Sequence, residues 1–318
     1  MQPSPPTPPA LSIIIVSWNV REPLRACLAG LPLADPQVEI IVVDSASADG
    51  TPAMVAADFP RVHLIASPAN LGYARGNNLG LQAAQGRYLF VLNPDTVVLP
   101  GALSALTAYL DAHPMVALVG PQLLWPRRGP QGDDLPQPTR RRFPPPALLF
   151  FESTWLQRLA PRRWLRRYYA MDLPADAPAD VDWLVGAALL VRRAAYEQVG
   201  GFDETFFMYS EELDWQRRLR AAGWRIVHLP AAQVLHAEAQ SSAQAPAATH
   251  IRFNSSKVRY MRKYHGAAAA QALRLWLLAQ FAAQLVLEAI KGALGHKRAL
   301  RQARVAAYWA VLRSGLRG

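Results

Sequence analysis

The chain has 318 residues, of which 51% are hydrophobic and 18% are charged. This composition excludes a disordered protein, and the length allows either one large α/β domain with an appendage or two small domains. A single cysteine, Cys27, excludes an internal disulfide and a thiolate metal cluster, so the fold needs no covalent cross-link and suits a reducing cytosol.

The net charge of +11 is distributed unevenly along the chain. From residue 252 to the C-terminus, 13 Lys and Arg residues are opposed by one acid, Glu288, whereas the first 251 residues hold 21 basic and 22 acidic residues. A neutral body with a basic tail favours an anionic membrane surface as a partner. It argues against nucleic acid, which requires positive charge on the body that carries the motifs.

The N-terminal part of the chain predicts an α/β domain. Residues 1–10 contain five prolines and no basic residue, so they predict a loose, disordered tail and not a signal peptide. From residue 11 to 120, short runs rich in β-branched residues alternate with helix-like segments, which predicts βαβ units and a mainly parallel, covered sheet. The predicted strands cover residues 11–16, 38–43, 62–65, 88–92 and 116–119, and the predicted helices begin near residues 23, 51, 73 and 100.

Residues 126–180 are rich in Pro and Arg and predict an irregular arm with one short amphipathic helix. Its arginines and aromatic residues leave three interpretations open: a site for a lipid diphosphate acceptor, a membrane-facing surface, or solvated surface. Regular structure is expected again from residue 181. The predicted elements there are a strand over 187–191, a helix over 212–222 and short strands over 225–227 and 233–235.

Residues 266–318 predict a basic amphipathic helical tail. A helix that begins at residue 267 places Gln280, Gln284, Glu288 and Lys291 on one side and apolar residues over the rest. A span of about 24 residues would extend about 36 Å, enough to cross a bilayer. The polar groups favour a helix that lies on the membrane surface over one that crosses it. Packing of the tail on the body or on a partner is the alternative.

Polar side chains follow three of the predicted strands. Ser17 and Asn19 follow the first strand, residues 44–51 follow the second, and residues 93–96 follow the fourth. Ligands of parallel α/β sheets bind at the carboxyl ends of strands. Asp44 can accept a hydrogen bond from the imide N–H of uracil or thymine, and Asp95 can hold a divalent cation against a diphosphate. Turn and helix-cap roles are the structural alternative for these aspartates.

An ordered set of motifs extends along residues 11–265. The segments are 13–19 (IIIVSWN), 42–51 (VVDSASADGT), 70–78 (NLGYARGNN), 92–95 (LNPD), 181–183 (VDW) with 186–187 (GA), 200–204 (GGFDE), 207–214 (FMYSEELD) and His236. This set resembles glycosyltransferase family 2, the inverting enzymes with a GT-A fold, and within it the rhamnosyltransferase-like branch. The resemblance implies an α/β, Rossmann-like GT-A domain with a mainly parallel sheet over residues 11–265, followed by the helical tail.

The resemblance also implies a site for a nucleotide-diphosphate sugar. Asp44 would contact the base, and Asp95 would bind Mg²⁺ or Mn²⁺, which neutralises the leaving diphosphate. His236 would complete the metal or diphosphate shell, with a histidine packed in the core as the alternative. The first position of the metal motif, usually Asp in the family, is Asn93 here. The implied donor-binding residues are Ser17, Asn19, Asp44, Ser45, Asn70, Gly72, Arg75, Asn78, Asn93, Asp95 and Gly186.

Glu211 and Glu212 stand where the family carries Glu-Asp, the second of which is the general base. Direct displacement needs a base on the face opposite the leaving diphosphate, so Glu212 is the candidate and Glu211 the alternative; acids that favour a helix N-terminus are the structural explanation. Glutamate is one methylene longer than aspartate, and moving a catalytic group by about an ångström can cost about a hundredfold in rate. The implied acceptor-binding residues are Asp182, Trp183 and Asp214, with strand packing as the alternative for the first two.

Together these features predict a metal-dependent inverting glycosyltransferase, acting in cell-surface polysaccharide synthesis. The expected donor is dTDP-rhamnose or a UDP-sugar, the expected acceptor is a glycan or a lipid-linked molecule, and the expected location is cytoplasmic, peripheral on the inner face of the cell membrane. The alternative is a catalytically silent family member that serves as a membrane-bound binding or scaffold subunit, motivated by Asn93 and Glu212. A sugar nucleotidyltransferase is disfavoured because no glycine-rich loop follows the first strand.

Overall fold

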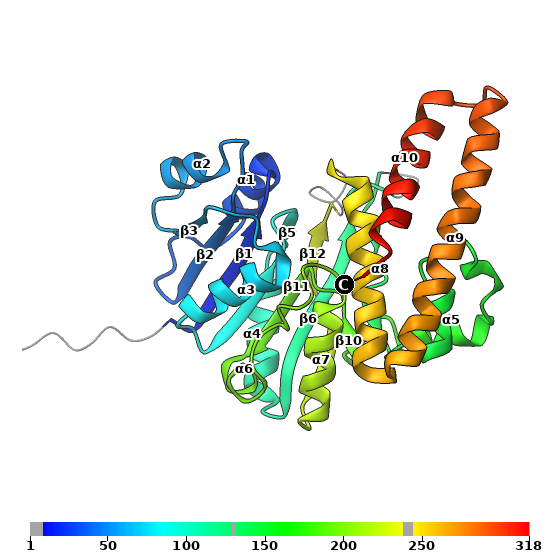
Figure 1. Ribbon diagram of the computed structural model, residues 1–318. Helices are drawn as coiled ribbons and strands as arrows, with labels where there is room; N and C mark the ends of the chain where they lie inside the picture. The colour runs from blue at the N-terminus through cyan, green and yellow to red at the C-terminus, as the bar shows by residue number, and fades with distance from the viewer. Residues whose placement is uncertain (1–8, 129–131, 238–243, 318) are drawn as a thin grey trace, which may run out of the picture. The chain divides into compact units, whose positions relative to one another are not determined.

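The computed structural model describes residues 9–128, 132–237 and 244–317, and the chain divides into two compact units (Figure 1). The first unit comprises Met1–Phe143, Arg166–Glu204 and Glu212–Gln240, and the second comprises Pro144–Leu165, Thr205–Glu211 and Ser241–Gly318. The division into a domain over 11–265 and a tail over 266–318 stays a prediction.

A ten-stranded sheet forms the centre of the first unit, with the main order β3-β2-β1-β4-β11-β6-β12-β5. The strands of the chain are β1 (Leu11–Ser17), β2 (Val38–Ser45), β3 (His63–Ser67), β4 (Tyr88–Leu92), β5 (Thr96–Val98), β6 (Val116–Trp125), β7 (Leu135–Pro136), β8 (Arg140–Arg141), β9 (Ala179–Asp180), β10 (Trp183–Leu184), β11 (Ala188–Arg192) and β12 (Arg225–His236). The pairs β2–β3, β1–β2, β1–β4 and β6–β12 are parallel, whereas β11 and β5 run antiparallel to their neighbours. The predicted, mainly parallel sheet is therefore confirmed.

Helices cover both faces of this sheet. Side chains of successive strand residues point to opposite faces, so each strand contributes to two cores, one under each layer of helices. Ile13 and Ile15 pack in one core with residues of α1, α2 and α4, and Ile14 packs in the other with residues of α3, α6 and α7. On the second face, α3 approaches closely: a Cβ on Gly76 would lie 2.8 Å from Val16 Cγ1. The helices are α1 (Arg21–Ala29), α2 (Thr51–Asp58), α3 (Gly72–Ala83), α4 (Ala102–Ala112), α5 (Arg162–Tyr168), α6 (Arg193–Val199) and α7 (Glu211–Ala221).

The arm and the C-terminal strands differ from the prediction in detail. Residues 126–180 contain β7, β8, the 3-10 helices η1 (Pro146–Phe150) and η2 (Gln157–Leu159), and α5, in agreement with an irregular arm that has one short helix. The two strands predicted over 225–227 and 233–235 are wrong, because β12 is continuous. Register shifts on β6 after Arg225 and after Leu229 absorb the break in the apolar pattern.

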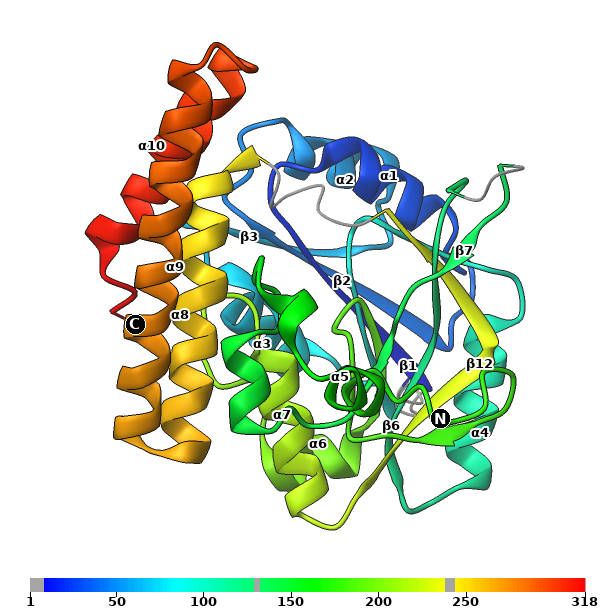
Figure 2. The same ribbon diagram turned by 90° about the vertical axis from the view of Figure 1, so that its right-hand side faces the viewer.

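The second unit contains three long helices, α8 (Pro246–His265), α9 (Ala267–Ala293) and α10 (Arg298–Ser314), which lie side by side (Figure 2). The sequence predicted one helix here, and α8 and α10 were missed. Inside the unit, Trp276 Nε1 donates to Phe150 O at 2.7 Å, and Lys257 Nζ lies 3.1 Å from a Glu152 carboxylate oxygen. Among the helices of the described residues, α9 is long and apolar enough to cross a membrane, judged by its length and composition alone.

Candidate active site

The carboxyl ends of β1 and β2 carry the first group of predicted site residues. Ser17 pairs in register with Asp44, whose side chain is buried and accepts a hydrogen bond from the Ser47 N–H at 2.9 Å through Oδ2. The other oxygen, Asp44 Oδ1, has no hydrogen-bond partner in the described parts of the chain, and neither do the buried hydroxyls of Ser17 and Ser45. Leaving a buried carboxylate oxygen unpaired is costly. The site therefore fits a ligand that brings an N–H donor, as a uracil or thymine ring does.

A loop-to-loop contact joins the ends of these two strands. Asn19, with a positive φ of 51°, accepts a hydrogen bond from the Ala48 N–H at 2.7 Å, and its own N–H donates to Ser47 Oγ at 2.9 Å. On the same loop, the Arg21 N–H donates to Asp49 at 2.9 Å. Asn19 thus shapes the loop beside Asp44, and its predicted contact with the donor stays a prediction.

Asp95 and His236 meet because β5 pairs antiparallel with the end of β12, with Thr96 opposite His236. The Asp95 carbonyl accepts a hydrogen bond from the Ala237 N–H at 3.0 Å, which fixes the backbone. Asp95 Oδ1 lies 3.4 Å from His236 Nε2, and both side chains are only 8% exposed. Two residues before Asp95, the buried Asn93 Oδ1 has no partner among the described residues. The two predicted metal ligands are therefore neighbours in space.

The chemistry of these groups fits a divalent cation. A carboxylate oxygen, an imidazole nitrogen and an amide oxygen are all ligands that Mn²⁺ accepts, and Mg²⁺ accepts the oxygens. Within the residues that the structure describes, no three His, Cys, Asp or Glu side chains form a cluster. A cation held by Asp95 and His236 would thus take further ligands from Asn93, from water or from a bound diphosphate.

Glu212 connects to this region through Gly186. Its side chain lies so close that a Cβ on Gly186 would be 3.2 Å from Glu212 Cβ and Cγ. Gly186 directly precedes Ala187, whose carbonyl accepts a hydrogen bond from the Asn93 N–H at 2.9 Å. The Tyr73 hydroxyl of α3 donates to Gly186 O at 2.5 Å. The candidate base, the loop after β4 and the start of α3 are therefore joined by direct contacts.

Four further predicted donor-binding residues, Asn70, Gly72, Arg75 and Asn78, lie on α3 or just before it. Asn70 Oδ1 accepts a hydrogen bond from the Gly72 N–H at 3.0 Å, which forms the turn into the helix, and Arg75 is exposed. The Asn78 side-chain amide donates to Phe202 O at 2.9 Å and accepts from the Phe202 N–H at 2.8 Å. Asn78 thus holds α3 to a distant loop, and direct contacts of these residues with a donor stay predictions.

Asp182 and Trp183, predicted to bind the acceptor, contact the backbone of the arm. Asp182 accepts a hydrogen bond from the Phe143 N–H at 2.8 Å, and Trp183 Nε1 donates to Arg142 O at 3.1 Å. Both side chains therefore position the segment that carries the arginines, and their contact with an acceptor stays a prediction.

The environment of Asp214 does not support its predicted contact with the acceptor. Its side chain is fully buried and pairs with Arg218 Nε at 3.0 Å, one turn along α7. Removing one partner of a buried ion pair is destabilising, so Asp214 supports the helix that carries Glu212, and its contact with an acceptor stays a prediction. Glu211, the alternative base, is buried and is grouped with the second unit.

Two other features lie outside the predicted chemistry. Burial raises the pKa of Cys27 to about 12, so this thiol stays protonated and is no nucleophile.

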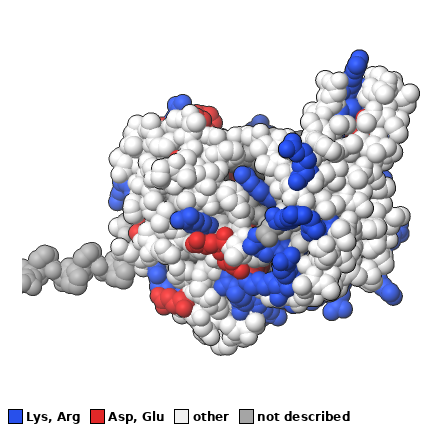
Figure 3. Space-filling model, viewed as in Figure 1, with Lys and Arg blue, Asp and Glu red and all other residues white. Residues whose placement is uncertain are grey.

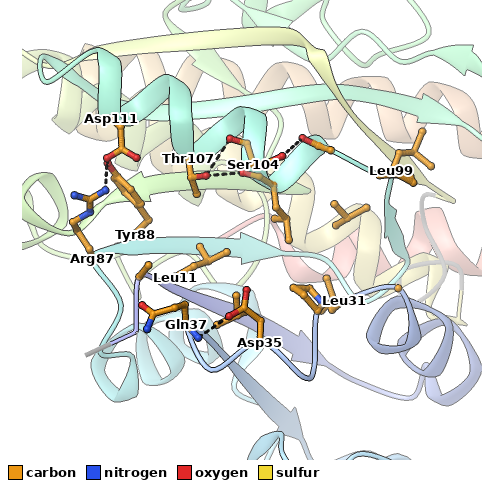
Figure 4. Close-up of a pocket in the computed structure, with 18 of the residues that line it drawn as sticks. Leu11, Leu31, Asp35, Gln37, Arg87, Tyr88, Leu99, Ser104, Thr107 and Asp111 are labelled. Atoms are coloured by element: carbon orange, nitrogen blue, oxygen red, sulfur yellow. Dashed lines mark hydrogen bonds and ion pairs between the residues drawn. The ribbon is translucent and has the colours of Figure 1, made fainter. Parts of the chain in front are cut away.

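A cavity lined by Leu11, Tyr88, Ser104 and other residues opens at the amino ends of β1, β2 and β4, with the Arg87–Asp111 ion pair on its wall (Figure 4). It contains none of the predicted site residues and lies at the wrong end of these strands for the site described above.

Gln137 is a buried polar residue that the sequence reasoning missed. Its side chain contacts both the ring and the backbone of His236. It lies in the Pro-rich arm, where no periodic pattern marks buried positions, so its distance of 99 residues from His236 hid the contact.

Comparison with known proteins places the chain in a class. Its sequence matches the profile of Glycosyl transferase family 2 over residues 12–214 and that of Glycosyl transferase family group 2 over residues 146–315. The chain belongs to glycosyl transferase family 2, which confirms the resemblance read from its motifs.

Among individual proteins, an N-acetylglucosaminyl-diphospho-decaprenol L-rhamnosyltransferase of Mycobacterium tuberculosis is 34% identical over 269 residues, which cover 80% of this chain and 85% of the relative. A mannosyltransferase from Pyrobaculum calidifontis, solved in complex with GDP-Man and Mn²⁺, superposes with a TM-score of 0.55 at 18% identity and covers 98% of this chain and 85% of that one. GalNAc-T7, solved with UDP, GalNAc and Mn²⁺, superposes with a TM-score of 0.54 at 15% identity over 72% of this chain and 43% of that one. These likenesses confirm the GT-A fold.

Proposed function

We propose that the chain is an inverting glycosyltransferase that moves a sugar, rhamnose by preference, from a nucleotide-diphosphate donor to a lipid-linked or glycan acceptor in cell-surface polysaccharide synthesis. The observation that supports the proposal is that, in a family 2 chain, Asp44 lies at the carboxyl end of β2 and Asp95 follows β4, two strands that both pair with β1, while Glu212 packs on Gly186 just before β11. The choice of rhamnose and of a polyprenyl-diphosphate-linked acceptor rests on the mycobacterial relative.

The residues support a single displacement at the anomeric carbon of the sugar. Asp44 Oδ1 accepts the imide N–H of the base and orients the nucleotide. Glu212 removes the proton from the acceptor hydroxyl, whose oxygen forms the new bond while the sugar–phosphate bond breaks and its electron pair leaves with the diphosphate. A divalent cation, which Asp95, His236 and Asn93 would hold, supplies positive charge to the leaving diphosphate.

A donor panel tests this function. The full-length protein is incubated with UDP-sugars, dTDP-rhamnose and GDP-sugars, with Mn²⁺ or Mg²⁺ present and a membrane extract as acceptor source, and nucleotide release is measured. We expect release with dTDP-rhamnose, and a loss of more than about a hundredfold in Glu212→Gln, because this variant keeps the shape of the side chain and removes the base.

Asp176→Asn serves as the matched control, since it removes an acid of the same unit that belongs to no predicted site. No turnover with any donor, together with unchanged dTDP and UDP binding in Asp95→Ala, would remove the proposal. The silent-scaffold alternative predicts that outcome, and the family match and the relative do not favour it.

The α9–α10 hairpin attaches the enzyme to the cytoplasmic face of the membrane. The end of the hairpin exposes large apolar side chains, with Leu294 80%, Val286 55% and Ile290 52% exposed. The one acid of the hairpin, Glu288, is buried and accepts a hydrogen bond from Arg301 at 2.5 Å, which leaves the free charge of the hairpin positive. Mostly uncharged surface with Lys and Arg side chains is visible there at the upper right of Figure 3. Apolar and cationic groups together suit an anionic lipid surface.

A further inference from the structure

Gln137 is held rigidly beside the metal-ligand candidates. Its backbone N–H donates to Leu123 O at 2.8 Å, and its carbonyl accepts a hydrogen bond from Gln122 Nε2 at 2.8 Å. These bonds fix the residue after β7 to the end of β6, the strand that pairs with β12. The Gln137 side chain is buried and reaches His236 at the end of β12.

The two hydrogen bonds of the Gln137 side chain determine which ring nitrogen of His236 carries the proton. Gln137 Nε2 donates to His236 O at 2.7 Å, because a carbonyl oxygen can only accept. The amide oxygen, Gln137 Oε1, then faces His236 Nδ1 at 3.1 Å, and only an Nδ1–H can satisfy it. A ring held in this way turns its Nε2 toward Asp95 Oδ1, 3.4 Å away, and leaves Nε2 as the ring nitrogen that can bind a cation.

His236 Nε2 and Asp95 Oδ1 can both bind a divalent cation. We propose that Gln137 is a positioning residue that holds the His236 ring so that its Nε2 faces the divalent cation. The proposal rests on the proposed function, because the cation is the one expected to accompany the donor diphosphate. A hydrogen-bond partner on the second ring nitrogen is the usual arrangement around metal-binding histidines, and its loss typically costs 10–100-fold in metal affinity.

If Gln137 only holds the arm to β12 through its hydrogen bonds, which we call a latch, a different result is expected. A latch affects the free energy of unfolding and leaves the affinity for the cation unchanged. Three variants separate the two roles. Gln137→Met removes both hydrogen bonds at similar volume, and Gln137→Glu keeps an acceptor for Nδ1–H but places a second acceptor against His236 O. Gln122→Met, the matched control, removes bonds to Gln137 O and Thr139 Oγ1, and it leaves the Gln137 N–H bond to Leu123 O and both side-chain bonds to the histidine in place.

The experiment measures Mn²⁺ binding to the full-length protein by electron paramagnetic resonance of free Mn²⁺, with dTDP or UDP added, and thermal unfolding of every variant. We expect Gln137→Met to bind Mn²⁺ about 10–100-fold more weakly than the natural protein, with a smaller loss for Mg²⁺, because the imidazole ligand favours Mn²⁺. We expect Gln137→Glu to unfold at a lower temperature yet to bind Mn²⁺ more tightly than Gln137→Met, and Gln122→Met to bind it as the natural protein does.

Natural affinity for Mn²⁺ in Gln137→Met overturns the inference and leaves the proposed function standing. Equal weakening in Gln122→Met and Gln137→Met also overturns it, because a disturbed arm then explains the loss. If the natural protein binds no Mn²⁺ with either nucleotide, the cation site itself is refuted, while the donor panel still tests glycosyl transfer independently.

Discussion

The position of the Glu212 carboxylate depends on one missing atom, the Cβ that Gly186 lacks. The φ angle of Gly186 is not positive, so its backbone conformation does not require glycine. The reason for glycine here is space, because a Cβ would lie 3.2 Å from Glu212 Cβ and Cγ and one of the two residues would have to shift. The glutamate that stands where the family usually has aspartate thus packs beside a residue with no side chain.

Gly186→Ala should lower kcat by roughly tenfold, because the added Cβ forces the Glu212 side chain to shift and small displacements of a catalytic group are costly. Steady-state kinetics with the active donor measure this effect. Gly30→Ala is the control, since a Cβ there would meet its nearest atom at an ordinary 3.6 Å.

Aspartate keeps the two atoms, Cβ and Cγ, that would lie 3.2 Å from the added Cβ, so the loss caused by Gly186→Ala should persist in a Glu212→Asp background. An unchanged kcat in Gly186→Ala would contradict the idea that Gly186 makes room for the Glu212 side chain.

At the scale of elements, the three-residue strand β5 brings the two predicted metal ligands together. Its antiparallel pairing with β12 brings Asp95 beside His236, 141 positions later in the numbering. The sequence suggested both residues by resemblance, yet it did not predict β5, because three residues carry too little alternation to mark a strand. The same limit applies to Gln137, which no local pattern distinguishes from the rest of the arm.

The end of the α9–α10 hairpin gives a prediction for this scale. Ile290→Gln with Leu294→Gln should weaken the affinity for vesicles of phosphatidylglycerol and phosphatidylcholine, measured by sedimentation, by about thirtyfold, since each exposed apolar side chain contributes roughly 1 kcal/mol when partly buried in lipid. High salt should weaken binding further through the basic residues.

Met115→Gln is the matched control, because Met115 is an exposed apolar residue of the first unit. Unchanged vesicle binding in the hairpin variant would contradict membrane attachment through the end of the hairpin.

At the scale of the whole molecule, His228 makes the stability of the first unit depend on pH. It lies on β12, is 1% exposed, and neither ring nitrogen has a partner among the described residues. Burial, and then the nearby Arg140 charge, lower the pKa of His228 to about 4 from 6.5. The unfolded chain therefore takes up this proton at a higher pH than the folded chain does, and stability is lost as pH falls from about 6.5 to about 4.

We expect the free energy of unfolding to drop across that interval by about 3 kcal/mol more in the natural protein than in His228→Leu, and the two slopes to agree above pH 7. Urea unfolding at a series of pH values measures the difference. His63→Leu, which alters an exposed histidine on β3, should keep the natural slope. A His228→Leu slope equal to the natural one would contradict a neutral, buried His228.

The sequence by itself determined the α/β class, the positions of the parallel strands along the chain, and the family. Apolar runs, glycine positions and the motifs around Asp44 and Asp95 are local patterns along the chain. A strand that is buried on both faces is apolar along its whole length, so the local sequence is enough to predict it. Strands β1, β2 and β4 accordingly begin where the sequence predicted.

Only the tertiary structure decided which polar residues share a site. The burial of Asp214 against Arg218, the contact of Gln137 with His236 and the fit of Glu212 against Gly186 all depend on distances between segments that pack together. The physical reason is that a polar side chain is equally acceptable in the sequence of a solvated loop or of a buried site. Its partners, which alone distinguish the two cases, come from elsewhere in the chain.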